Sequence, residues 1–483
     1  MKLERKLFVV GCCIMLISLG LSALATRTIT DTSDTMLSSI TTSAGGVYPA
    51  TFAGLQAALN SGNNGTLTVT MPSGIIYYSA NIWVRNNTHL QGAGKYQTIL
   101  KRTGVTTTKG IYVYKDRNVV LSDFTVHGNN SKSGGAATGS SNFYIKGSQN
   151  ISLININSSY SSGNGLDVSA GDGYTFGIRK FTILNCDITH TDASYNGLNI
   201  GDSYNGIINT VNILDSGVDG FDCTNNRNIT INNIIITGST DGIKIGGADA
   251  TTIAENISLD NINIKCSTNG LKIDIFCRKI NINNINIMAG GKGIYDYSIY
   301  GHININNFVV KSVGMGLITN NAGSNNITFS NGDVQSTTDN CVYLTKTRDV
   351  ELSNVRIYGG TADLYMFNAN RTKIISCNIN HARTQHGIII SACSNWTIAN
   401  CDITDNTASG YGGLNLTGGV SKDFVITGNR FMNNHQYAIS IIVGSVNFVI
   451  TNNIMRYPGS GHTNLVDRSA CAAANNVTAN NLI

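Results

Sequence analysis

The feature that most constrains this chain is a short pattern that recurs between Gly217 and Asp274. A glycine followed by an apolar, a variable and an apolar residue occurs three times, at Gly220–Cys223, Gly242–Ile245 and Gly270–Ile273. Between these copies lies a second pattern: apolar-x-apolar, two polar residues ending in Asn, then apolar-x-apolar. Alternation with a period of two is typical of half-buried strands. Three short strands per unit, repeated at a near-fixed length, predict a solenoid.

The second pattern extends over most of the chain. Its first strand begins at 14 positions, mostly 22 to 28 residues apart: Val119, Ile151, Phe181, Gly206, Ile229, Ile257, Ile280, Ile303, Ile327, Val350, Thr372, Trp396, Phe424 and Phe448. A length of 483 residues would otherwise suggest several domains, but an internal repeat overrides that expectation. We therefore predict one all-β domain of about 14 coils over residues 49–483.

Asparagine marks one turn of the repeat. The fifth residue of the frame is Asn at ten positions: Asn155, Asn185, Asn233, Asn261, Asn284, Asn307, Asn331, Asn354, Asn400 and Asn452. Asn tolerates left-handed backbone angles, and its amide can bond both along a stack and to the backbone. We predict that these side chains form a buried Asn ladder.

The amino terminus has the features of a targeting segment. Positive residues precede an apolar run from Leu7 to Ala25, which ends in an A-x-A cleavage site at Ala23–Ala25. Residues 1–25 are therefore predicted to be a signal peptide. The alternative is an uncleaved anchor, because the run is long enough to span a membrane. Either reading places the protein outside the cell or at its surface. Residues 26–48 are rich in Ser and Thr and are predicted to be a linker.

Composition excludes some partners. Charged residues make up only 13% of the chain, the formal net charge is +5, and no basic run or basic-aromatic patch is present. Nucleic acid binding is therefore not expected. Because no second long apolar run exists, we expect membrane contact only through an uncleaved N-terminal segment.

The cysteines are predicted to be core residues. None of the 11 forms a CxxC motif, so zinc binding is not expected. Cys186, Cys377 and Cys401 fall at the same inward position of their repeats, and Cys223 at another, as small apolar residues would. A disulfide between Cys377 and Cys401 is left open, because they lie one repeat apart.

The first coils carry a family resemblance. Thr51–Leu59 has helical apolar spacing, Thr66–Gly74 reads as a strand ending in P-x-G, and Leu90–Leu100 reads L-x-G-x-G-x-x-x-T-x-L. These features resemble the pectate-lyase-like superfamily. The resemblance implies a right-handed parallel β-helix with a short N-terminal capping helix. It also implies that the Asn ladder lies between the second and third sheets, which assigns the Gly-led strands to the first.

Charges gather on the Gly-led strands. Asp222, Lys244 and Lys272 occupy the outward position of three successive coils, followed by Asp274, while Asp219 and Asp241 occupy the position before the glycine. We call these six residues the charge cluster. Since coils stack about 4.8 Å apart, like charges would repel unless they are protonated, paired or bridged by a cation. We predict a functional site here; the alternative is a mutually neutralising set of surface charges.

The cluster offers the groups for a polysaccharide lyase. Asp219, Asp222 and Asp241 supply hard oxygen ligands and are predicted to bind a divalent cation, with Ca²⁺ the expected ion. Lys272 or Lys244 would be the base, its pKa lowered by the neighbouring Lys and by burial. Lys272, Lys244, Asp219 and Asp241 are thus the predicted catalytic residues for β-elimination in a uronate polymer. A glycoside hydrolase would instead use two carboxylates as acid and base.

Motif comparisons within the superfamily leave the activity open. Asn196–Asp274 resembles the catalytic core of polygalacturonases, but Asp241 stands where that family has His, and Lys272 and Asp274 stand at its R-x-K motif. Gly163–Ser169 is similar to a motif of the mannuronan epimerases, but lacks its Tyr and His. The resemblance therefore implies action on a polysaccharide without naming the reaction.

Other outward residues are predicted to bind substrate: Asp274, Tyr295, Tyr343, Tyr365 and His386. The tyrosines would support sugar rings, although Tyr is also common in strands. Since fold alone does not imply function, a non-catalytic adhesin, polysaccharide-binding or surface-layer protein is the alternative. An open cleft over the charge cluster would favour the enzyme, and a flat wall the alternative.

Overall fold

The structure is a computed structural model. It describes residues 39–62, 65–104, 108–129, 139–170, 177–320, 326–441, 444–456, 466–467 and 477–482. The predicted signal peptide and most of the predicted linker lie outside these residues. In the part that is described, no helix is long and apolar enough to cross a membrane.

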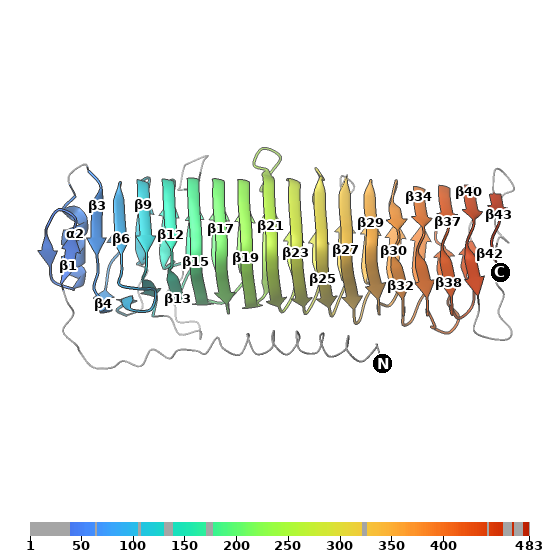
Figure 1. Ribbon diagram of the computed structural model, residues 1–483, viewed down its shortest axis with the longest axis horizontal. Helices are drawn as coiled ribbons and strands as arrows, with labels where there is room; N and C mark the ends of the chain where they lie inside the picture. The colour runs from blue at the N-terminus through green and yellow to red at the C-terminus, as the bar shows by residue number, and fades with distance from the viewer. Residues whose placement is uncertain are drawn as a thin grey trace, which may run out of the picture. The chain divides into compact units, whose positions relative to one another are not determined.

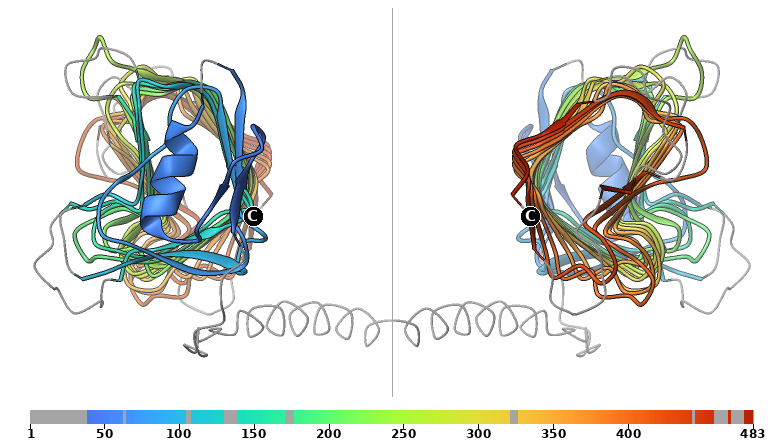
Figure 2. Two further views of the ribbon diagram at one scale, coloured as in Figure 1. Left: turned by 90° about the vertical axis from the view of Figure 1, so that its left-hand side faces the viewer. Right: turned by 90° about the vertical axis from the view of Figure 1, so that its right-hand side faces the viewer.

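Successive coils of the chain form two parallel sheets around a common core, as the repeat predicted (Figures 1 and 2). We call the first the Gly-led sheet. Its 16 strands are β5 (Ile82–Trp83), β8 (Ile111–Tyr114), β11 (Phe143–Lys146), β14 (Leu166–Ser169), β16 (Leu198–Gly201), β18 (Asp219–Thr224), β20 (Asp241–Gly246), β22 (Leu271–Ile273), β24 (Ile294–Asp296), β26 (Leu317–Asn320), β28 (Val342–Thr345), β30 (Leu364–Phe367), β33 (Ile388–Ser391), β36 (Leu414–Leu416), β39 (Ile439–Ile441) and β42 (Val466–Asp467).

We call the second the Asn-turn sheet. Its 27 strands are β1 (Ile40–Thr42), β2 (Val47–Tyr48), β3 (Leu67–Thr70), β4 (Gly74–Tyr78), β6 (Thr88–Gln91), β7 (Thr98–Arg102), β9 (Arg117–Ser122), β10 (Thr125–His127), β12 (Gln149–Ile154), β13 (Asn157–Ser161), β15 (Arg179–Thr191), β17 (Tyr204–Leu214), β19 (Arg227–Ser239), β21 (Ala254–Cys266), β23 (Cys277–Ala289), β25 (Ile303–Ser312), β27 (Ile327–Ser336), β29 (Val350–Tyr358), β31 (Lys373–Ile375), β32 (Asn378–Asn380), β34 (Ser394–Ala399), β35 (Asp402–Thr404), β37 (Lys422–Thr427), β38 (Arg430–Met432), β40 (Val446–Thr451), β41 (Ile454–Arg456) and β43 (Val477–Ala479).

The predicted three strands per coil need one correction. In the middle coils the second and third strands are continuous, as in β19, whose pairing with β21 runs from Ile229 opposite Ile257 to Ile236 opposite Ile264. The Asn between the two halves bends the strand through a left-handed backbone angle, with a φ of 55° at Asn233. Strands β3, β6 and β43 add further coils at the two ends, outside the 14 predicted starts.

The Asn turn is built as predicted, but its side chains face outward. All ten predicted residues have positive φ, and the amides bond along the stack, as from Asn185 Nδ2 to Asn155 Oδ1 at 3.0 Å. Most of these side chains are exposed, so the prediction that the stack is buried is wrong. The buried Asn stack lies one position later, in the C-terminal coils: Asn429 Nδ2 donates to Asn453 Oδ1, and Asn453 Nδ2 to Asn481 Oδ1, each at 3.0 Å.

The N-terminal end is capped by helix α2 (Phe52–Asn60), which confirms the predicted capping helix (Figure 2). Thr51 is the N-cap, because its side chain accepts a hydrogen bond from the Gly54 amide at 3.1 Å. The apolar face of α2 buries Gly54, Leu55, Ala58 and Leu59 against the first strands. The predicted linker ends earlier than expected: β1 and β2 pair with each other, and β1 also pairs with β3, so the cap includes residues 40–48.

The core is filled by stacked apolar side chains and thiols. Cys186, Cys223, Cys377 and Cys401 are all buried, as predicted. The disulfide left open between Cys377 and Cys401 is not formed, since both thiols are free. The Cys377 amide instead donates to Cys401 Sγ at 3.4 Å.

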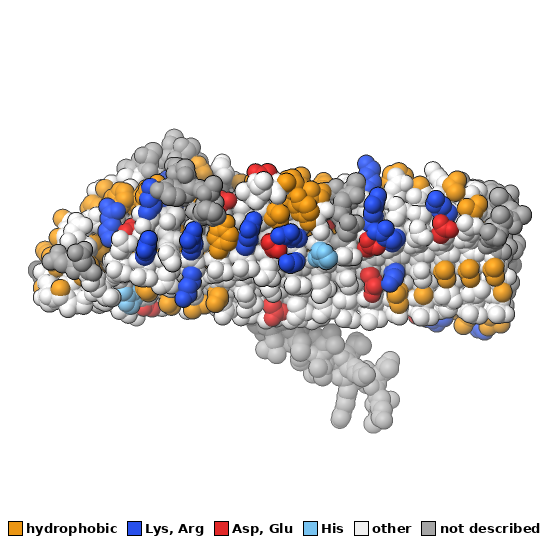
Figure 3. Space-filling model, turned by 90° about the horizontal axis from the view of Figure 1, so that it is seen from above, with side chains coloured by type: hydrophobic (Ala, Val, Ile, Leu, Met, Phe, Trp, Pro, Cys, Tyr) orange, Lys and Arg blue, Asp and Glu red, His pale blue; other side chains and the backbone are white. Residues whose placement is uncertain are grey.

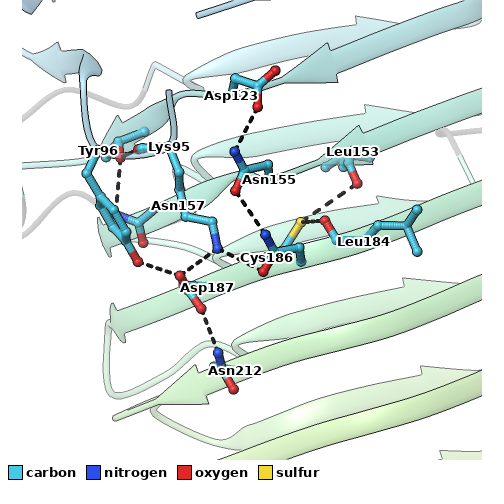
Figure 4. Close-up of polar contacts among 12 residues, drawn as sticks. Lys95, Tyr96, Asp123, Leu153, Asn155, Asn157, Leu184, Cys186, Asp187 and Asn212 are labelled. Atoms are coloured by element: carbon cyan, nitrogen blue, oxygen red, sulfur yellow. Dashed lines mark hydrogen bonds and ion pairs between the residues drawn. The ribbon is translucent and has the colours of Figure 1, made fainter. Parts of the chain in front are cut away.

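One loop connects coils that are not neighbours. Lys95 and Tyr96, which precede β7, reach past β10 and β13 to Asp187 on β15 (Figure 4). Lys95 Nζ lies 2.8 Å and the Tyr96 hydroxyl 2.5 Å from Asp187 Oδ2, and Asn212 Nδ2 donates to Oδ1 at 2.8 Å. Because the Lys95 and Asp187 side chains are largely buried, this contact is a polar clamp across the first coils. We call it the N-terminal clamp.

Candidate functional site

The strand register brings the charge cluster together. Asp219 lies opposite Asp241 and Asp222 opposite Lys244 in the pairing of β18 with β20. Lys244 in turn lies opposite Lys272 in the pairing of β20 with β22. The glycine before each strand is required by this packing, because a Cβ at Gly242 would lie 2.3 Å from the Gly270 carbonyl oxygen. The predicted columns are therefore confirmed.

The lysines of the cluster are ion-paired. Lys244 Nζ lies 3.4 Å from Asp222 Oδ2, and Lys272 Nζ lies 3.0 Å from Asp274 Oδ2. Burial lowers the pKa of Lys244, but the charges of Asp222 and Asp219 outweigh it, so its pKa is raised. The prediction that the pKa of this lysine is lowered is wrong. A lysine that holds its proton this firmly is a poor general base.

Asp219 is the group whose protonation the cluster changes most. Only 5% of the residue is exposed, and burial, with further contributions from Asp222 and Asp241, raises its pKa to about 6. Asp241 is held differently, since the backbone amide and Nδ2 of Asn269 donate to its Oδ1 at 3.0 and 2.9 Å. The cluster thus places Asp219, whose carboxyl keeps its proton up to about pH 6, beside Asp241, whose carboxyl accepts two hydrogen bonds.

The arrangement does not favour the predicted calcium ligands. Within the described ranges, no three His, Cys, Asp or Glu side chains are grouped so that they could hold a metal ion. The Asp222 carboxylate forms an ion pair with Lys244 and accepts a hydrogen bond from the Thr224 hydroxyl.

The predicted substrate-binding residues divide into two groups. Tyr343 and Tyr365 are partly exposed, and their tilted rings have centroids 5.2 Å apart, as expected for an outward pair. Tyr295 is buried, with Lys292 Nζ 3.7 Å from its ring centroid. His386 is also buried and its ring is occupied, since Nδ1 accepts from the Gly412 amide at 2.9 Å and Nε2 lies 3.0 Å from Asn415 Nδ2.

These contacts make His386 a structural residue. Burial lowers the pKa of His386 to about 4, so the ring is neutral at ordinary pH. The predictions that His386 and Tyr295 line an open groove are wrong: Gly412 and Asn415 of the next coil bind the His386 ring, and the Tyr295 ring packs against Lys292 and Tyr297. Two cavities lie elsewhere: one of about 510 Å³ on the Asn-turn sheet beside Asn331 and Arg356, and one of about 720 Å³ at the N-terminal end. Neither lies over the charge cluster.

The structure also reveals residues that the sequence reasoning missed. The outward column that carries Asp167 continues toward the N-terminus through Tyr144, Tyr112 and Trp83, each opposite the next. The signal was present, because Gly110 to Val113 follows the Gly-led pattern. It was hidden in the other two coils, where Asn81 and Asn142 replace the glycine.

Comparisons with known proteins agree with this fold. A family model described as "Right handed beta helix region" matches residues 316–482. No curated protein matches the chain by sequence. Among solved structures, the N-terminal fragment of bacteriophage phi29 gene product 12 is similar, with 16% identity, a TM-score of 0.53, and coverage of 83% of this chain and 84% of that chain.

Two enzymes are similar at a greater distance. A Family 28 exopolygalacturonase of Yersinia enterocolitica has 13% identity and a TM-score of 0.41, covering 77% of this chain and 75% of that chain. The A-module of a mannuronan C-5 epimerase from Azotobacter vinelandii has 15% identity and a TM-score of 0.30, covering 88% of this chain and 94% of that chain. Both superpose too loosely to support an argument about activity. The stacked parallel coils and the family match over residues 316–482 show that the chain folds as a right-handed parallel β-helix, the fold that the resemblance implied.

Proposed function

We propose that the protein acts on an acidic polysaccharide outside the cytoplasm and hydrolyses a glycosidic bond by general acid–base catalysis at the charge cluster. The observation that carries this proposal is the placement of Asp219, whose pKa is about 6, beside the carboxylates of Asp222 and Asp241 on adjoining positions of β18 and β20. Carboxyl groups whose environments separate their pKa values divide the acid and base roles.

In the proposed reaction, the protonated Asp219 donates its proton to the glycosidic oxygen as the bond to the anomeric carbon breaks. The Asp241 carboxylate takes a proton from the water that attacks this carbon. Lys244 and Lys272 hold the uronate carboxylates of the substrate, because they lie opposite each other in the outward column. This assignment replaces elimination as the favoured reaction, since neither lysine is placed as a free base.

The proposal is tested by incubating purified protein with polygalacturonate. We expect new reducing ends without ultraviolet-absorbing unsaturated products, at a rate that falls as the pH rises through about 6, where Asp219 loses its proton. Asp219→Asn should lower the rate by about 10²- to 10⁴-fold, the usual contribution of a general acid. The matched control is Asp423→Asn, which changes an exposed carboxylate on β37 and should leave the rate unchanged.

Other outcomes identify other mechanisms. Ultraviolet-absorbing products that disappear with a chelator would contradict hydrolysis and restore the calcium-dependent elimination predicted from the sequence. An Asp219→Asn variant with undiminished activity would show that Asp219 is not the general acid.

A second candidate is a non-catalytic polysaccharide-binding protein of the cell surface. Two observations favour it: Lys244 pairs with Asp222 and Lys272 with Asp274, which neutralises most of the cluster, and neither of the two cavities lies over the cluster. Binding of polygalacturonate without either product, over the whole range from acid to alkaline pH, would support this candidate.

A further inference from the structure

Aromatic side chains form a continuous row at the N-terminal end of the Gly-led sheet. The ring centroids of Trp83 and Tyr112 are 4.1 Å apart, those of Tyr112 and Tyr144 are 5.2 Å apart, and those of Tyr112 and Tyr114 are 6.0 Å apart. All four rings are partly exposed. We call Trp83, Tyr112, Tyr114 and Tyr144 the aromatic platform.

Cations surround this platform on every coil. Arg85 lies 4.7 Å from the Trp83 ring centroid and Lys115 lies 4.7 Å from that of Tyr114. Lys109 and Lys146 lie 4.9 and 4.8 Å from that of Tyr144. Lys146 is neutralised by Asp167 at 2.7 Å, and Lys109 donates to the Gly139 carbonyl. Arg85 and Lys115 are the two of these cations that also line a cavity beside the platform.

A cavity adjoins the platform and shares two of its cations. The cavity of about 720 Å³ is lined by Arg85, Lys115 and Arg117, with Asn86, Asn87 and Asn118 among its other polar residues. None of the described residues that line it is acidic. Aromatic rings beside a basic, amide-lined cavity combine the two features that recognise a charged sugar: a flat apolar surface and donors for an anion.

The platform belongs to a larger basic surface. Arg117, Arg179 and Arg227 start β9, β15 and β19 at the edge nearest the cavity. Viewed from above, Lys and Arg side chains gather in rows over the N-terminal half of the solenoid (Figure 3). Arg117 also lines the cavity, so a ligand that extends from the platform into the cavity meets positive charge, which favours an anionic ligand.

We propose that the aromatic platform and the adjoining cavity form a binding site for an anionic oligosaccharide, separate from the charge cluster. Sugar rings would pack against the exposed parts of the Trp83, Tyr112 and Tyr144 side chains, and their carboxylate or sulfate groups would meet Arg85 and Lys115. One ring per coil repeats about every 4.8 Å, comparable to the advance of one sugar unit in an extended chain. The site lies on the same outward column as the charge cluster, but its binding does not depend on cleavage.

The two tryptophans give this proposal a direct readout. Only Trp83 and Trp396 occur in the chain, and Trp396 is buried, with its ring stacked 4.3 Å from that of Phe424. In a Trp396→Phe background, the fluorescence therefore reports on Trp83 alone. The probes are hexamers of galacturonic acid, of glucose and of sulfated glucose. We expect the first or the third to change the emission and to bind at least tenfold more tightly than the glucose hexamer.

Variants in the same background separate the two parts of the site. Tyr112→Ala combined with Tyr144→Ala should weaken binding at least tenfold, because the sugar rings lose their contact with these two side chains. Arg85→Gln combined with Lys115→Gln should weaken it at least tenfold and reduce its dependence on salt, because screening acts on the charged contacts. Tyr77→Ala is the matched control, since Tyr77 is an exposed tyrosine on β4 of the other sheet, and should have no effect.

Two results would overturn the proposal. The glucose hexamer binding as tightly as the anionic probes would exclude recognition of charge, and unchanged affinity in both double variants would exclude the platform. Thermal melting of each variant checks that the fold is retained. The same titration in Asp219→Asn should give unchanged affinity, so that failure of the catalytic proposal and failure of this one are distinguished.

Discussion

At the scale of single residues, the interior contains a carboxyl group where neighbouring coils have other side chains. Asp296 lies between Ile273 and Thr319 in the inward column of the Gly-led sheet. It is fully buried, the Ser298 amide donates to its Oδ1 at 2.9 Å, and its Oδ2 has no partner. Burial raises the pKa of Asp296 to about 7.

This residue should make the stability of the protein depend on pH. Between about pH 4 and pH 7 the unfolded chain has lost this proton while the folded protein keeps it, so the free energy of unfolding falls as the pH rises through that window. Asp296→Asn should therefore be more stable than the wild type at pH 8, by on the order of a few kcal/mol, with little difference at pH 4. Melting temperatures measured across this range test the prediction, and parallel curves for the two proteins would contradict it.

At the scale of elements, the N-terminal clamp joins the loop before β7 to β15, although β7 and β15 do not pair. Asp187→Asn removes the charge that Lys95 and Tyr96 contact, and leaves the largely buried Lys95 without its counterion. We expect a loss of about 1–3 kcal/mol, the usual cost of an unsatisfied buried group. Because coils contact mainly their neighbours, the loss should be confined to the first coils.

Hydrogen exchange resolved by coil measures this effect. Amides of β6, β7 and β10 should exchange faster in the variant, while those of β34 and β37 should not change. The control is Asp402→Asn, which breaks an exposed pair with Arg430 and should cost less than about 1 kcal/mol. Uniform acceleration along the whole chain would show that the clamp does not act locally.

At the scale of the whole molecule, the coils should be interchangeable units. Ile280 and Ile303 lie opposite each other, and the residues before them, Lys279 and His302, have φ angles of 56° and 58°. Deleting residues 280–302 therefore joins matching backbone conformations. The shortened protein should keep its β-sheet circular dichroism per residue and melt cooperatively.

The matched control is a deletion that removes only part of one coil. Removing residues 280–290 alone takes out most of β23 but leaves β24, so every later strand would be displaced around the solenoid. This variant should lose its β-sheet signal or aggregate. Similar behaviour of the two deletions would contradict a structure built from whole coils.

Much of the fold could be predicted from the sequence because its causes are local. Side chains alternate in direction along a strand, so the period-two pattern identified which residues face the core and which form the outward column of Asp222, Lys244 and Lys272. Left-handed angles at the repeated Asn follow from the residue itself. These features need no knowledge of distant parts of the chain.

The tertiary structure alone decided how exposed and how charged these residues are. His386 is buried against Gly412 of the next coil, although it was predicted to face a groove. The stacked Asp222 and Asp219 raise the pKa of Lys244, although its own burial would lower it. Burial and pairing depend on residues 20 or more positions away, and a repeat pattern does not contain that information.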